Sequence, residues 1–88
     1  MTRWFEKQAT DISNRIADVM SEIEALKDEL QELLDTQQEK LDNMPENLQN
    51  SERYSTMEER RDIMQQAIDE LDEALSGLES ASDTLGSL

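Results

Sequence analysis

Apolar residues in the first half of the chain follow one another in an unbroken alternation of four- and three-residue steps. The series is Phe5, Ala9, Ile12, Ile16, Val19, Ile23, Leu26, Leu30 and Leu33. An average step of about 3.5 residues is the period of a coiled-coil seam, along which one helix packs against another. Met20, Leu34 and Leu41 widen this stripe toward the broader face of a helical bundle. The pattern predicts a helix over residues 3–42.

A second apolar row predicts a helix over residues 55–84. Its members are Met57, Met64, Ile68, Leu71, Leu75, Leu78 and Leu85, with Arg61 and Ser82 in polar slots and Ala67, Ala74 and Ala81 beside the row. The alanines would let another helix approach closely. Ser55 and Thr56 each precede a glutamate by three residues, which is the pattern of a capping box. Either is therefore an expected N-cap, and Ser51 is the rival.

Residues 43–54 are expected to form the turn between the helices. Pro45 biases Met44 away from helical geometry and is suited to open a short helical turn through residues 46–48. Met44, Leu48 and Tyr54 could then close over the tip as a small apolar cap. A recognition loop is the functional interpretation of this tip, and a turn with its own apolar plug is the structural one that we favour.

Two long helices with a short connection pack antiparallel, so the expected fold is all-α, a single antiparallel two-helix hairpin over residues 1–88. Matching the stripes sets Leu41 near Met57, Leu34 near Met64, Leu30 near Ile68 and Ile23 near Leu75. The first helix then projects beyond the second by about five to nine residues, a segment that includes Trp4 and Phe5.

Two helices cannot bury apolar faces of this width, so we expect two hairpins to assemble into a four-helix bundle. Trp4 and Phe5 of one chain would pack on the other. A monomer whose first residues fold back on Leu85 and Leu88 is the alternative. A domain-swapped pair, in which the turn opens, stays possible on the sequence alone.

Charge restricts the partners of the chain. The chain contains eight Lys and Arg residues and 22 Asp and Glu residues, which gives a net charge of −14. Such a surface repels nucleic acid and anionic membranes, so the expected partners are a second copy and basic protein surfaces. Arg53, Arg60 and Arg61 are expected to form ion pairs near the tip. Their expected partners are Asp35, Glu39 and Asp42.

Acidic residues along a rod also suggest a mimic of duplex DNA that occupies the binding channel of another protein. The residues expected to carry that activity are Glu22, Glu29, Asp69, Glu70, Asp72 and Glu73. Acidic helix surfaces are also common for solubility alone. The acidic stretch lacks the alternating ligands and glycine of a calcium loop, so we expect no metal site.

The chain contains no His and no Cys, which removes most catalytic designs and every disulfide. We expect no enzyme activity and no cofactor. No apolar run is long enough to span a membrane, and residues 1–13 lack the apolar core of a signal peptide. A cytoplasmic protein is therefore expected.

A resemblance to known proteins rests on three segments: residues 42–49 (DNMPENLQ), residues 51–53 (SER) and residues 68–75 (IDELDEAL). These segments resemble small uncharacterised helical proteins of bacteriophages and bacteria, which have a similar turn before an acidic helix. The resemblance implies a hairpin and a phage or prophage context inside a bacterial cell, and it implies no catalytic residue.

Three functions follow as hypotheses. The first is a self-associating module that binds protein through Trp4 and Phe5 at the open end or Leu48 and Tyr54 at the tip. The second is a DNA-mimic inhibitor of a host nucleic-acid-binding protein of the restriction or CRISPR type. The third is a structural phage component whose assembly is itself the function.

Overall fold

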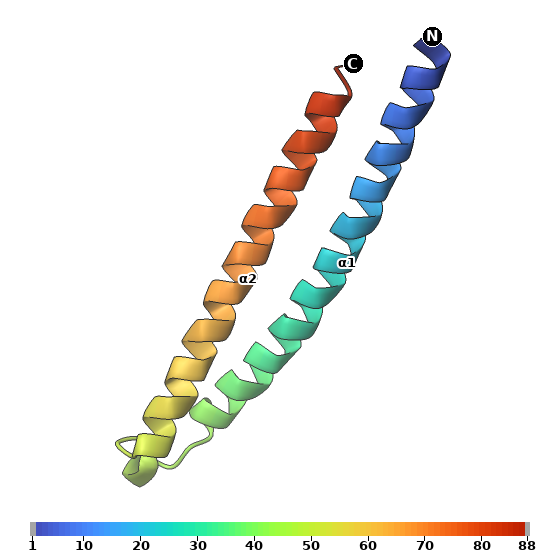
Figure 1. Cartoon of the computed structure of the whole chain (residues 1–88). Coiled ribbons are helices and arrows are strands. Elements are labelled where there is room, and N and C mark those ends of the chain that lie inside the picture. Colours follow the sequence, from blue (N-terminus) through green and yellow to red (C-terminus); the bar gives the residue numbers. More distant parts are fainter. Residues whose placement is uncertain (1, 88) are drawn as a thin grey trace.

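The chain forms two long antiparallel helices joined by a tight turn (Figure 1). A computed structural model describes residues 2–87, with side chains from Trp4 onward. Helix α1 spans Thr2–Asp42, a 3-10 helix η1 spans Glu46–Leu48, and helix α2 spans Glu52–Leu85. The rod measures 72 × 15 × 13 Å and contains no strand within residues 2–87. The predicted all-α hairpin is confirmed.

A single seam of side chains from α1 and α2 holds the helices together. The seam residues of α1 are Ala9, Ser13, Ile16, Met20, Ile23, Lys27, Leu30, Leu34, Gln37 and Leu41, and Met44 continues the series just beyond the helix. Those of α2 are Tyr54, Met57, Arg61, Met64, Ile68, Leu71, Leu75, Leu78, Ser82 and Leu85. All are buried or half-buried, and both series alternate three- and four-residue steps as coiled-coil packing requires.

Packing is tightest in the half of the seam near the tip. The buried apolar side chains of the described residues are Leu34, Leu41, Met57 and Ile68, and Leu41 is only 2% exposed. Polar contacts between side chains also cross between the helices in this register. Arg61 Nη1 donates to Gln38 Oε1 at 3.2 Å, and Lys27 forms an ion pair with Asp72. Both fit the predicted pairing of the stripes.

The side of α1 that packs against α2 is rotated about the helix axis from the side that the sequence spacing favours. Met20, Leu34 and Leu41, expected only to widen the stripe, lie on the seam, whereas every second member of the predicted series lies outside it. We call these outer residues the flank row: Phe5, Ile12, Val19, Leu26 and Leu33. Their exposed fractions are 47%, 45%, 46%, 55% and 60%. The rotation arises because one helix covers only one side of α1.

The tip follows the expectation for Pro45 but leaves its apolar cap open. Pro45 immediately precedes η1, and its carbonyl accepts a hydrogen bond from the backbone N–H of Leu48 at 2.9 Å. Met44 and Tyr54 are half-buried, whereas the side chain of Leu48 is exposed. The predicted plug of three residues is therefore incomplete.

Helix α2 begins three residues before the expected start, with Ser51 as its N-cap. Ser51 has an extended backbone (φ −77°, ψ 157°), and its Oγ accepts from the backbone N–H of Tyr54 at 3.2 Å. The same hydroxyl donates to the carbonyl of Leu48 at 2.7 Å, which ties the cap to η1. Ser55 and Thr56, the predicted caps, lie inside the helix.

The substitution Ser51→Ala is expected to lower the free energy of unfolding by about 1 kcal/mol, because the N-terminal amide of α2 loses its acceptor. The matched control Ser55→Ala should be nearly neutral, since alanine is the better helix former. Urea unfolding followed by circular dichroism measures both. Equal effects of the two substitutions would contradict capping by Ser51.

Candidate protein-interaction face

One side of the hairpin carries the Lys27–Asp72 and Arg61–Gln38 contacts of the seam, and on the opposite side the stretch of α1 from Phe5 to Leu33 presents an apolar row. On the apolar side, the flank row borders two shallow grooves between the helices. One, of about 330 Å³, is lined by Ile12, Arg15, Ile16, Val19 and Leu78. The other, of about 340 Å³, is lined by Leu26, Glu29, Leu30, Leu33 and Leu71. The charged residues Arg15 and Glu29 form part of the rim, whereas the other lining residues are apolar.

Helix α2 contributes small residues to the same side. Ala74 and Ala81 come three residues after Leu71 and Leu78, and helix residues three apart share a face. Both alanines are exposed. Gly77 lies between them, and a Cβ added there would meet nothing within 4 Å. The side chains on this part of α2 are small, so another helix can pack closely against it.

Together these residues form what we call the apolar face. It consists of the flank row, the groove residues Leu71 and Leu78, and Ala67, Ala74 and Ala81. Ile63, which is 66% exposed and precedes Ala67 by four residues, extends it toward the tip. The acidic residues of α2 lie off this face, except for Glu70, which by helical spacing borders it. The flank row and the alanines thus contain no acidic residue, and Glu22 and Glu29 border the face on α1.

The four predicted contact residues do not form one site. Trp4 is 68% exposed at the open end of the hairpin, and Phe5 belongs to the flank row. Leu48 and Tyr54 lie at the tip, the other end of a rod 72 Å long. Sequence reasoning missed the flank row as a separate surface. Its signal was present, since five large apolar residues recur every seven positions beside a second apolar line.

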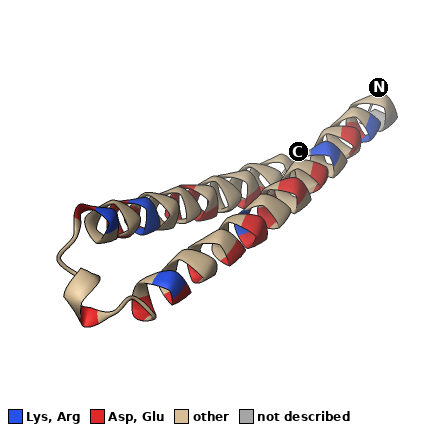
Figure 2. Ribbon diagram, turned by 90° about the horizontal axis from the view of Figure 1, so that it is seen from below, with Lys and Arg blue, Asp and Glu red and all other residues tan. Residues whose placement is uncertain are grey.

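The predicted acidic residues are exposed, and acidic residues occur along both helices (Figure 2). Glu22 and Glu29 lie seven residues apart on α1, whereas Asp69, Glu70, Asp72 and Glu73 lie on the side of α2 away from the seam residue Leu71, since helix residues are about 100° apart. Gln65 donates to Asp69 at 3.1 Å, Gln66 donates to Glu70 at 3.3 Å, and Lys27 pairs with Asp72. Three of these carboxylates thus have partners within the hairpin, and the DNA-mimic hypothesis stays a prediction.

The predicted ion pairs at the tip are wrong. Arg61 pairs instead with its chain neighbour Asp62 at 3.1 Å. No ion pair of the described residues joins Arg53 or Arg60 to α1. Two of the expected acceptors are engaged on their own helix, because Gln31 donates to Asp35 and Gln38 donates to Asp42.

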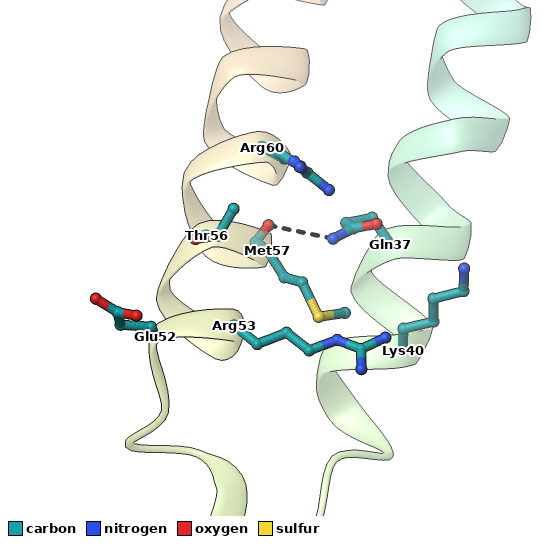
Figure 3. A pocket seen from close by; sticks show the side chains of 7 residues that line it. All are labelled: Gln37, Lys40, Glu52, Arg53, Thr56, Met57 and Arg60. Atoms are coloured by element: carbon teal, nitrogen blue, oxygen red, sulfur yellow. Dashed lines mark hydrogen bonds between the residues drawn. The ribbon is translucent and has the colours of Figure 1, made fainter.

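A cavity of about 420 Å³ near the tip is locally basic (Figure 3). Its lining includes Lys40, Arg53 and Arg60 but only one acid, Glu52. The side chain of Arg53 extends across from α2 toward Lys40 on α1 (Figure 3). Between Arg60 and Arg53 in this view, Gln37 Nε2 donates to the carbonyl of Met57 at 3.4 Å. Lys40, Arg53 and Arg60 therefore share one cavity near the tip.

Within residues 2–87, no group of three or more His, Cys, Asp and Glu side chains is placed to hold a metal ion. No described helix combines the length and apolar character that a membrane crossing requires. No protein-family model, curated protein or solved structure matches the chain. The resemblance to phage and bacterial helical proteins therefore stays a prediction.

Lys27 is the basic residue of α1 that occupies a seam position. Its hydrogen bond to Asp72 raises the pKa of the Lys27 ammonium above the ordinary value, and partial burial opposes this. The charges of Asp72, Asp28 and Glu24 raise the pKa further. Lys27 therefore stabilises the folded hairpin in its protonated form.

The substitution Lys27→Met should flatten the alkaline pH dependence of stability. Because the folded pKa is raised, the contribution of Lys27 is complete below its unfolded pKa of about 10.4 and is lost as pH rises through the folded value. The unfolding free energy of the unsubstituted chain should therefore fall more steeply above about pH 10 than that of the variant. Urea unfolding across that range measures the difference. If the control Lys7→Met, outside the seam, has the same effect, the pair with Asp72 is not its cause.

Proposed function

We propose that this chain is a non-enzymatic helical protein-interaction module that self-associates through its apolar face. The observation that carries the proposal is the flank row: five large apolar side chains at seven-residue intervals, each at least 45% exposed. A seven-residue repeat of this kind is the pattern of a helix packed against a further helix. The hairpin itself supplies no such partner.

The chemistry of the face supports a helical occupant. Continuous exposed apolar surface on a small protein marks an interaction site, because it is costly to leave in water. Burying the exposed half of a leucine or isoleucine is worth roughly 1 kcal/mol. A second hairpin provides large side chains from α1 and small ones from α2, so the face is suited to pack against a copy of itself.

The net charge of −14 opposes association of two copies. Added salt screens that repulsion and leaves apolar contacts intact, so self-association should strengthen as ionic strength rises. Capture of a basic protein by the acidic surface, the DNA-mimic hypothesis, has the opposite salt dependence. The direction of the salt effect therefore separates the two functions.

Sedimentation velocity is expected to show a complex with at least twice the 10.2 kDa mass of the chain. The double substitution Leu26→Gln with Leu33→Gln should weaken self-association at least about tenfold, since it removes two flank-row contacts per copy. Circular dichroism should show unchanged helicity, because both side chains lie outside the seam.

The matched control is Leu48→Gln, which makes the same change at an exposed leucine of the tip. It should leave the sedimentation coefficient unchanged. A single 10.2 kDa species at every concentration and salt level would overturn the proposal.

A further inference from the structure

We propose that two hairpins pack apolar face to apolar face with their tips at opposite ends, α1 against α1 and antiparallel, with Val19 on the two-fold axis. The inference rests on the proposed self-association and adds its geometry. The competing arrangement puts both tips at one end and α1 of each copy over α2 of the other.

The flank row matches itself in the opposite-end arrangement. With Val19 facing Val19 of the second copy, Ile12 faces Leu26 and Phe5 faces Leu33. All five side chains of each row therefore find an apolar partner. On the other edge of the face, Gly77 of each α2 helix lies level with Ala81 of the other, and small residues let the helices approach closely.

The charges that border the flank row favour the same geometry. Arg15 and Glu22 follow Ile12 and Val19 by three residues, so they lie along one edge of the row. Centring on Val19 brings Arg15 of each copy opposite Glu22 of the other, which gives two pairs of opposite charge. With both tips at one end, Glu29 instead lies level with Glu70 of the second copy, and like charges oppose each other.

The uncovered ends of the hairpin also fit together only with the tips apart. At the open end, α1 runs past the end of α2 (Figure 2), and Leu85 lines a shallow groove there together with Phe5 and Ala9. Trp4 is 68% exposed beyond that point. At the tip end of the face, Leu33 and Ile63 are 60% and 66% exposed. The opposite-end arrangement lays the projecting end of one copy on these residues of the other.

Disulfide trapping tests the geometry, because the chain has no native cysteine. Val19→Cys should cross-link to itself under mild oxidation, since an axial residue meets its own copy within disulfide reach. A mixture of Phe5→Cys and Leu33→Cys chains should yield more of the mixed dimer than of either homodimer. The matched control Asp18→Cys, one residue from the axis but on the outer surface, should cross-link far less.

Charge reversal provides a second readout that needs no cysteine. Arg15→Glu should weaken the dimer about tenfold, because two attractions become two repulsions. Adding Glu22→Arg to the same chain should restore the affinity. Lys7→Glu makes the same change in net charge away from the row and should have a much smaller effect.

The outcomes separate the two proposals. A dimer that neither cross-links through Val19 nor recovers with the Arg15→Glu, Glu22→Arg pair would overturn the opposite-end geometry and leave self-association standing. A chain that sediments only as a monomer would overturn both. Preferential cross-linking through Val19, together with recovery by the charge swap, is the result expected.

Discussion

Everything in this molecule depends on the seam between α1 and α2, since the hairpin has no other layer to bury its apolar residues. Leu34, Leu41, Met57 and Ile68 form its best-packed part. Because the seam occupies one side of α1 only, the wide apolar stripe of that helix is divided. One line of side chains holds the hairpin together, and the other, the flank row, is left for contacts outside it.

Polar residues within the seam restrict how the helices can slide. Lys27, Gln37 and Arg61 occupy positions where leucine or isoleucine would give more stability, and each reaches a polar partner at the edge of the seam. A slip by one heptad would separate these partners while keeping apolar contacts. Such residues in coiled coils fix the register at some cost in stability. The chain thus holds one alignment of its two helices.

The hairpin, the end of α1 at Asp42 and the short helical turn after Pro45 could all be predicted from apolar spacing and proline geometry. The start of α2 could not, because Ser51 acts through an extended backbone set by the preceding turn, whereas Ser55 had the better local motif. The prediction of ion pairs at the tip was wrong because it left out hydrogen bonds within α1. Glutamines four residues away hydrogen-bond Asp35 and Asp42 within α1. The rotation of the seam could not be predicted either. Two neighbouring lines of apolar residues run along α1, both are continuous in the sequence, and α2 covers only one of them.

Because burial is uneven along the seam, the local stability of the hairpin is higher near the turn than at the open end. The least exposed residue, Leu41, lies next to the turn, where closing the loop costs the least chain entropy. Toward the other end, seam positions hold Ala9, Ser13 and Ser82, which contribute little buried area. Local unfolding therefore begins with separation of the two helix ends and proceeds toward the turn. Amide protons near Leu41 and Met57 should exchange with solvent last, so that an isolated hairpin behaves as a pair of arms hinged at the tip.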